Sequence, residues 1–413
     1  MSSVTTGADA RTLLSAEAVR RTAHRMLALA RDGELDDWRV DFDRLPATAD
    51  YIVNIVRERY PQLDPPLHAR WRHFVFEGRD LGRAMFTAGA GSDTASRARA
   101  AFDLAVTSVL LDAGAGPGWR YLDAVSGTNA TRSEGLALAS LRWFASGGLS
   151  DDTRDPLRAD AAALLRVDAA ALNQAFQASD ANPLAGASGR AQLLNRLGTT
   201  LQARPDLFAI ADSPRPGGLF DVLKSRAVNH SVPAAVILEL LLDAFGSIWQ
   251  GRPILDGVPL GDCWPHPALH GGTPAERFAP LHKLSQWLTY SLIEPLQDAG
   301  IVVSRLDDLT GLAEYRNGGL FVDMGVLVPR AAEAGSRTYA VSDPFVVGWR
   351  SMTVALIDHV APLVRERLRI GSEAFSLAKL LEGGTWEAGR RIARERRADG
   401  GPPFQILSDG TVF

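Results

Sequence analysis

The sequence predicts a mainly α-helical protein, and three observations support this prediction. Apolar residues recur at intervals of three and four through most of the 413 residues, as they do on one face of a helix. Strand-like stretches are few and short, and no repeat or linker divides the chain. Apolar residues make up 46% of the composition, enough for a large core. We therefore expect one large helical domain over residues 1–413 with small β additions, in which a helical segment of residues 1–90 packs on a core of residues 91–413.

The helices can be justified in order from their stripes and end signals. Gly33 suits the C-cap of the first helix, Ser133 the N-cap of the third, and Gly147 the end of the third. Pro295 should bend or end the helix that contains it, because proline lacks the N–H that continues the ladder. The expected helices cover residues 13–33, 96–114, 133–148, 158–179, 232–249, 275–300, 344–368 and 377–400. Strands are expected within residues 300–306 and 401–413, the second with an Asp409–Gly410 turn.

The bulk composition excludes several classes of function. The formal charge of −4 lacks the excess of positive charge that is typical of nucleic-acid-binding proteins. Cys263 is the single cysteine, so no disulfide within the chain can form, and a reducing, cytoplasmic location is the simplest expectation. The first 26 residues lack the apolar run of a secretory signal, and no apolar run is long enough to span a membrane. We expect a small-molecule partner and leave the oligomeric state open.

A first polar cluster lies in the expected helix of residues 275–300. Lys283, Gln286, Trp287 and Tyr290 are spaced as i, i+3, i+4 and i+7, which places them on one helical face. A cation, an amide, an indole and a phenol suit the wall of a ligand pocket. The alternative is a lysine that extends over an aromatic core toward solvent.

A second cluster follows an apolar run as Glu314, Tyr315, Arg316 and Asn317. A carboxylate that stabilises a cationic sugar, beside an arginine that binds phosphate, is one coherent use of these residues. The alternative is a structural Arg316–Glu314 ion pair under a loop.

Three further residues interrupt apolar or capping patterns. Asp103 is surrounded by apolar residues in the expected helix of residues 96–114, and a buried aspartate needs a partner or a purpose. Arg132 and Glu134 stand in the segment "RSEG" at a helix start. The helix dipole alone favours Glu134 there, and a substrate-facing carboxylate is the second interpretation.

The segment "GDCWPHPALH" offers zinc-type ligands as Asp262, Cys263, His266 and His270. Pro265 and Pro267 prevent the helix that would place both histidines on one face. We therefore expect no metal and no cofactor.

Long motifs identify a family resemblance that covers most of the chain. "RWRHF", "RSEGLALAS", "LGDCWPH", "HKLSQWLTYSLIEPL" and "LTGLAEYRNGGLFVDMGVL" occur in the order found in the uracil catabolism protein 4 family, which this chain resembles. The resemblance implies a role in a uracil-degrading pathway that passes through ring-opened nucleotide intermediates.

A weaker resemblance to queuosine 5′-phosphate N-glycosylase suggests a mechanism. Lys283 and Gln286 match that family's Lys-x-x-Gln helix, and Glu314, Tyr315 and Arg316 match its Asp-Tyr-Arg. Glu replaces Asp, and "NGG" stands where that family has Val-Pro-Gln. The resemblance implies a helical fold related to DNA base-excision glycosylases and hydrolysis of an N-ribosidic bond.

Together the resemblances imply cleavage of ribosylurea, or its 5′-phosphate, to urea and ribose or ribose phosphate. Glu314 would act at C1′, Asp103 would bind sugar hydroxyls or orient water, and Lys283 would help urea leave. The implied substrate-binding residues are Arg316, Tyr315, Gln286, Trp287, Tyr290, Arg132 and Glu134. Two alternatives remain: an amidohydrolase or deaminase that uses Asp262, His266 and His270 as metal ligands, and a non-catalytic pathway scaffold.

Overall fold

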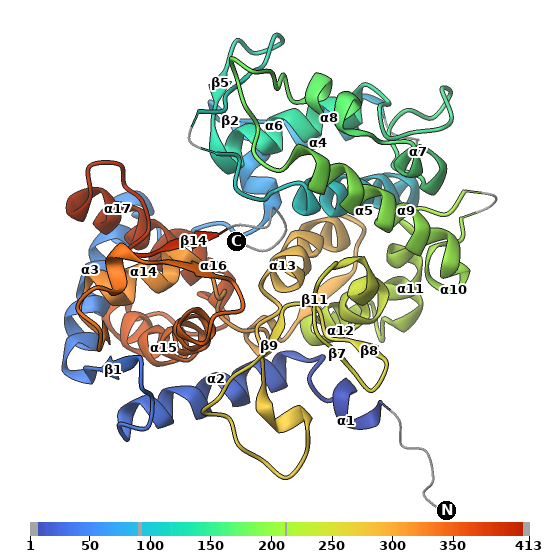
Figure 1. Ribbon diagram of the computed structural model, residues 1–413. Coiled ribbons are helices and arrows are strands. Elements are labelled where there is room, and N and C mark those ends of the chain that lie inside the picture. Colours follow the sequence, from blue (N-terminus) through green and yellow to red (C-terminus); the bar gives the residue numbers. More distant parts are fainter. Residues whose placement is uncertain (1–6, 90–92, 117, 211–212, 408–413) are drawn as a thin grey trace, which may run out of the picture. The chain divides into compact units, whose positions relative to one another are not determined.

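The computed structural model describes residues 7–89, 93–116, 118–210 and 213–407 (Figure 1). The described chain is mainly helical, as predicted, and its strands are two or three residues long and pair in twos. It forms two compact units. The described residues of unit 1 lie within Met1–His68, Gly251–Gln286 and Arg305–Leu407, and those of unit 2 within Ala69–Gln250 and Trp287–Ser304. The single domain expected from the sequence stays a prediction.

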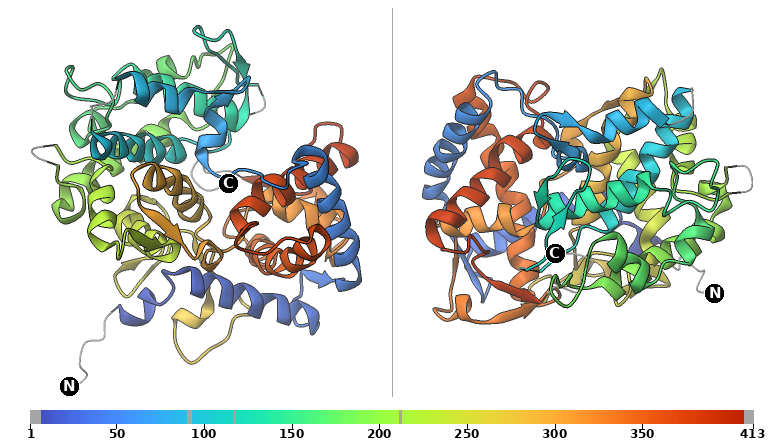
Figure 2. Two further views of the ribbon diagram at one scale, coloured as in Figure 1. Left: turned by 180° about the vertical axis from the view of Figure 1, so that it is seen from behind. Right: turned by 90° about the horizontal axis from the view of Figure 1, so that it is seen from above.

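Unit 1 is built around the long helix α15 (Pro344–Leu368), which is buried on most of its surface because its residues are apolar nearly all round. α2 (Ala16–Arg31), α3 (Leu45–Arg59) and α14 (Tyr315–Asp323) pack against α15. N-terminal and C-terminal helices thus lie side by side, blue beside orange and red in every view (Figure 2). The other helices are α1 (Ala8–Arg11), α16 (Leu377–Leu380), a π-helical turn (Leu381–Thr385) and α17 (Trp386–Arg396).

The strands of unit 1 form four two-stranded pairs. Three of the pairs are antiparallel and one, β13 with β14, is parallel. The pairs are β1 (Trp38–Val40) with β12 (Leu327–Pro329), β7 (Ile254–Leu255) with β8 (Val258–Pro259), β9 (Cys263–Pro265) with β10 (Phe278–Pro280), and β13 (Thr338–Ala340) with β14 (Gln405–Leu407).

Unit 2 is a bundle of shorter helices. α5 (Thr94–Leu110) packs against α6 (Arg132–Ala145), α9 (Ala187–Ala203) and α11 (Gly218–Arg226). The other helices are α4 (Leu81–Gly89), α7 (Ala161–Leu165), α8 (Ala169–Ala175), α10 (Pro205–Phe208) and α12 (Ala234–Phe245). The strand pairs are β2 (Val75–Phe76) with β3 (Arg79–Asp80), β4 (Tyr121–Leu122) with β5 (Asn129–Ala130), and β6 (Ser231–Pro233) with β11 (Val302–Ser304).

Local end signals explain where most predicted helices begin and end. The Ser15 hydroxyl caps α2 by accepting a hydrogen bond from the Ala18 amide, and Gly33 follows that helix with φ of 81°. The helix predicted over residues 158–179 is two helices, because Asp160 and Asp168 each cap a new start. α6 begins at Arg132, with Thr131 rather than Ser133 as N-cap. The predicted Asp409–Gly410 turn lies outside the described residues.

α13 (Lys283–Asp298) differs from its prediction at both ends. It begins at Lys283 rather than near residue 275, because Phe278–Pro280 pairs with β9. It does not end at Pro295. The carbonyl of Ser291, which loses its helical N–H partner to that proline, accepts a hydrogen bond from Trp71 Nε1 at 2.7 Å. Among the described residues, no helix is both long and apolar enough to cross a membrane.

Candidate functional site

Glu314, the predicted catalytic carboxylate, is the N-cap of α14. Its Oε2 accepts the amide hydrogen of Arg316 at 2.7 Å, and its Oε1 accepts that of Asn317 at 2.5 Å. The side chain is largely buried, with 8% of the residue exposed. Backbone N–H groups and the positive end of the helix dipole stabilise a negative charge at this position. The geometry therefore presents an oriented anion.

The glycines after Glu314 allow α14 to pack closely on its neighbours. A Cβ at Gly318 would lie 2.7 Å from Trp349 Nε1 on α15. A Cβ at Gly389 on α17 would overlap the carbonyl oxygen of Arg316. The close approach at Gly318 explains why a glycine rather than a larger residue stands at this position of α14.

Arg316 does not pair with Glu314 within the described part of the chain, so the structural ion pair considered as the alternative is wrong. Arg316 Nη1 donates instead to the carbonyl of Gly400 at 2.7 Å, and its guanidinium lies 4.7 Å from the centre of the Tyr315 ring. Its predicted phosphate contact stays a prediction.

A buried ion pair of Asp262 and Arg350 links two of the predicted motifs. The Asp262 carboxylate accepts from Arg350 Nη1 and Nη2 at 2.8 and 2.7 Å, and from the backbone amide of Lys283 at 3.1 Å. Arg350 Nε donates to the carbonyl of Ala313 at 3.0 Å, next to Glu314. Burial alone would raise the pKa of Asp262, but the charge and hydrogen bonds of Arg350 hold that pKa well below its usual range.

Gln286 forms a second link between the same segments. Its Oε1 accepts the amide hydrogen of Thr310 at 2.9 Å, and its Nε2 donates to Thr310 Oγ1 at 2.7 Å. The first turn of α13 is thereby fixed to the loop that precedes Glu314. We call Asp262, Lys283, Gln286, Thr310, Glu314 and Arg350 the Asp262 cluster. Lys283 is half-buried at the first residue of α13.

The remaining predicted residues lie in unit 2. Asp103 is fully buried, pairs with Arg215 at 2.7 Å, and accepts the amides of Gly217 and Ala159 at 2.6 and 3.2 Å. Burial raises the pKa of Asp103 to about 6, although Arg215 and these amides oppose the rise. Asp103 therefore has the partners that a buried aspartate needs, and its role toward a substrate stays a prediction.

Glu134 and Trp287 lie near Arg70, a residue that the sequence patterns did not indicate as a site residue. Glu134 is half-buried in the first turn of α6, and Trp287 and Tyr290 on α13 are 4% and 0% exposed. The guanidinium of Arg70 lies 5.6 Å from the Trp287 ring centre. Arg132 is exposed, with φ of 53°. Its role in substrate binding stays a prediction.

Comparison with known proteins assigns the chain to a family. The sequence model of the family described as "Protein of unknown function (DUF1688)" matches residues 12–413. "Uracil catabolism protein 4" of Lachancea kluyveri is 37% identical over 435 aligned residues, which cover 97% of this chain and 98% of that protein. "Protein urg3" of Schizosaccharomyces pombe is 38% identical over 413, with the same coverage.

The chain belongs to the DUF1688 family. The family resemblance predicted from the motifs is thereby confirmed. Because the match extends over nearly the whole chain, it includes both the Asp262 cluster and the Arg70 segment.

The zinc-type residues of this DUF1688 chain do not converge. Asp262 binds Arg350, and His266 donates from Nε2 to the carbonyl of Pro344 while its Nδ1 accepts the amide of Ala268. Burial lowers the pKa of His266. Within the described ranges, no three His, Cys, Asp or Glu side chains are grouped as metal ligands. Asp262 and His266, two of the three residues of the metal-dependent alternative, are thus engaged elsewhere.

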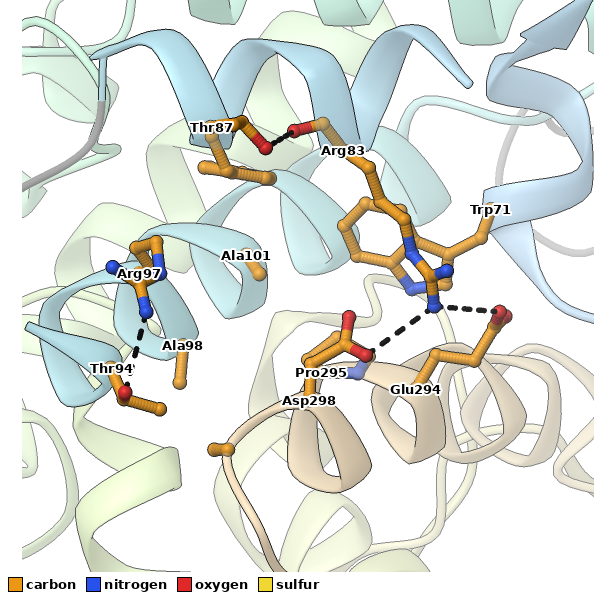
Figure 3. Close-up of a pocket in the computed structure, with 12 residues that line it drawn as sticks. Trp71, Arg83, Thr87, Thr94, Arg97, Ala98, Ala101, Glu294, Pro295 and Asp298 are labelled. Atoms are coloured by element: carbon orange, nitrogen blue, oxygen red, sulfur yellow. Dashed lines mark hydrogen bonds and ion pairs between the residues drawn. The ribbon is translucent and has the colours of Figure 1, made fainter. Parts of the chain in front are cut away.

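A separate cavity of about 590 Å³ lies in unit 2 among α4, α5 and the last turn of α13. Arg83 reaches across it from α4 toward Asp298 and Glu294, at 3.4 and 3.9 Å, while Trp71 forms one wall (Figure 3). None of the predicted site residues lines this cavity.

Proposed function

We propose that this chain acts in uracil catabolism as a hydrolase of an N-ribosidic bond, releasing urea from ribosylurea or its 5′-phosphate. The observation that carries the proposal is the Asp262–Arg350 ion pair, which joins the start of α13 to the loop before Glu314. It brings together the two motifs that resemble an N-glycosylase. The name of the Lachancea kluyveri relative, "Uracil catabolism protein 4", supports the pathway.

The reaction needs a stabilised positive charge at C1′. As the bond between C1′ and nitrogen lengthens, the sugar acquires oxocarbenium character, and a nearby carboxylate lowers the energy of that state. Glu314 is the residue that we assign to this task. Its position at the helix N-terminus supports the assignment, because two amide hydrogens orient the carboxylate and stabilise its charge.

The electrons of the broken bond remain on the departing urea nitrogen. Lys283 would give this nitrogen a proton or stabilise its charge, while a water oxygen bonds to C1′ and its released proton leaves through a carboxylate or solvent. The sum is one water consumed, one urea released and one free sugar. The cluster supports this arrangement because the Asp262 carboxylate fixes the backbone of Lys283.

The proposal is tested by incubating purified protein with ribosylurea and with its 5′-phosphate, and by measuring urea, ammonia and free sugar. We expect urea and sugar in equal amounts and no ammonia. Ammonia from a ring-opened nucleotide would instead favour the amidohydrolase alternative. Absence of any product from both substrates would contradict the hydrolase and favour a scaffold.

A further inference from the structure

Arg70 is a fully buried arginine in the short 3₁₀ segment Arg70–Phe74 of unit 2. Its backbone amide donates to Ser291 Oγ at 2.9 Å, and the adjacent Trp71 indole donates to the Ser291 carbonyl. The segment "RWRHF" is therefore fixed on α13, and the Arg70 side chain leaves a rigid support.

The Arg70 guanidinium is held on one side and unpaired on the other. Nε donates to Ser108 Oγ at 2.7 Å, and Nη1 contacts Asp112 Oδ2 at 3.0 Å and the Ser133 carbonyl at 3.4 Å. Nη2 is buried, and no residue in the described part of the chain accepts its hydrogens. A buried donor without an acceptor is costly, so its persistence requires an explanation.

The surroundings of Arg70 are those expected of a small planar ligand site. The Trp287 ring lies 5.6 Å from the guanidinium carbon. Glu134 directly follows Ser133, whose carbonyl contacts Arg70. Burial lowers the pKa of Arg70, and the charges of Asp112 and Glu134 partly offset that lowering. Arg70 thus brings a donor close to a carboxylate and an aromatic face.

We propose that Arg70 binds the oxygen of a ureido group through Nη2, in a subsite that it forms with Glu134 and Trp287. A ureido group is planar, with one acceptor oxygen and several N–H donors. The guanidinium satisfies the oxygen, the Glu134 carboxylate accepts an N–H, and the indole packs against the plane. A phosphate fits this subsite less well, because Glu134 and Asp112 would repel it.

The inference rests on the proposed hydrolysis for the class of ligand, because ribosylurea carries a ureido group. All three residues of the subsite lie in unit 2.

Arg70→Lys tests the subsite, and Arg190→Lys is its matched control. Arg190 is equally buried in unit 2, but its guanidinium is bound by the carbonyls of Leu111, Ala113, Gly114 and Ala185. Both variants exchange a buried arginine for lysine. Only the first removes a donor that we assign to the ligand.

Binding of N-methylurea and of ribose 5-phosphate is measured for each protein by NMR titration. We expect Arg70→Lys to raise the Kd for N-methylurea by roughly tenfold to a hundredfold, which is the range for loss of a charged hydrogen bond. The Kd for ribose 5-phosphate should change by less than about twofold. Arg190→Lys should change neither. Unchanged N-methylurea binding in Arg70→Lys, a loss confined to ribose 5-phosphate, or no binding of N-methylurea by the unaltered protein would each overturn the inference.

Glu134→Gln provides the test if Arg70→Lys does not fold, because Glu134 is only half-buried. Glu134→Gln should also weaken the binding of N-methylurea and leave the binding of ribose 5-phosphate unchanged. Unchanged binding of N-methylurea would reject the subsite. The titrations are independent of turnover. A protein that binds N-methylurea through Arg70 but releases no urea would refute the proposed reaction and keep the ureido subsite.

Discussion

Two aspartates, the nearly buried Asp262 of unit 1 and the fully buried Asp103 of unit 2, are paired with arginine and yet have opposite acid–base behaviour. Asp262 in unit 1 accepts two bonds from Arg350, one from the Trp264 indole and one from the Lys283 amide. Its pKa lies well below the usual range in spite of burial. Asp103 in unit 2 has one arginine contact and two amide contacts, and burial raises its pKa to about 6.

The difference shows that the geometry of the partner decides whether a buried carboxylate stays charged. Two-point pairing with a planar guanidinium compensates the lost hydration of Asp262, whereas a single contact does not fully compensate that of Asp103. The first pair is therefore suited to hold a site in place over a wide pH range. The second is suited to take up a proton in mild acid.

The largest expected effect follows from breaking the pair in unit 1. Arg350→Met leaves the Asp262 charge nearly buried and unpaired, so we expect the unfolding free energy to fall by about 3–5 kcal/mol at pH 7. Urea unfolding measures this change. Arg350→Lys, which keeps the charge but loses the two-point geometry, should lose less. A loss below about 1 kcal/mol in Arg350→Met would contradict the comparison.

The loss of stability caused by the equivalent substitution in unit 2 should depend on pH. In Arg215→Met, Asp103 can remain protonated at pH values at which it is ionised in the unaltered protein. Below pH 6 both proteins hold a neutral Asp103, and the difference in stability should be small. Above pH 6 the cost of the substitution should grow by about 1.4 kcal/mol per pH unit. Equal losses at pH 5 and pH 8 in urea unfolding would show that Asp103 is permanently charged.

Asp103 alone should also make the unfolding free energy depend on pH. Its pKa is near 3.9 in the unfolded chain and about 6 in the folded one, so the folded state binds more protons between these values. The resulting stability, on the order of 3 kcal/mol, is complete below pH 4 and is lost as pH rises through 6. Asp103→Asn should remove this slope from urea midpoints measured between pH 4.5 and 7.5. An unchanged slope would reject the raised pKa.

Asp262 affects the pH dependence of the unfolding free energy with the opposite sign. Its folded pKa is depressed, so its stability is present above the unfolded value near 3.9 and is lost as pH falls further. The two aspartates thus act in different pH windows, and only that of Asp103 overlaps mild acid.

The smallest expected effect on stability concerns the cap of α14. Glu314→Ala removes acceptors for two amides and should cost about 0.5–2 kcal/mol. Glu314→Asp keeps a capping carboxylate and should stay close to the unaltered protein in thermal melting. If the aspartate variant melted as low as the alanine variant, capping would not explain the stability contribution of this residue.

Much of the fold followed from local signals in the sequence. α15 matches its predicted range of residues 344–368, because an apolar run between Asp343–Pro344 and Arg369 is bounded by a cap and a left-handed residue. The prediction of one helix over residues 158–179 is wrong, because two capping aspartates start separate helices in spite of the continuous apolar spacing. The spacing of Lys283 and Gln286 placed both on α13 correctly. It did not show that Gln286 would bind Thr310.

The partners of the buried charges were not predictable from the sequence. Asp262 and Arg350 are 88 positions apart, and only the tertiary fold brings them together. The available signal was a lone arginine within an otherwise apolar helix, which indicates a buried cation but not its acid. Arg70 gave a similar signal in "RWRHF". Local patterns specify helices and caps, whereas long-range polar pairs depend on packing that a single sequence does not encode locally.

The catalytic role of Glu314 is tested by Glu314→Gln, through the rate of urea release from ribosylurea and its 5′-phosphate. The substitution keeps the size of the side chain but removes the negative charge assigned to C1′. It also places an amide donor against the capped amides, so activity must be expressed per folded molecule. We expect a fall of about a hundredfold to a thousandfold in kcat. Urea release at nearly the unaltered rate by folded Glu314→Gln would contradict it.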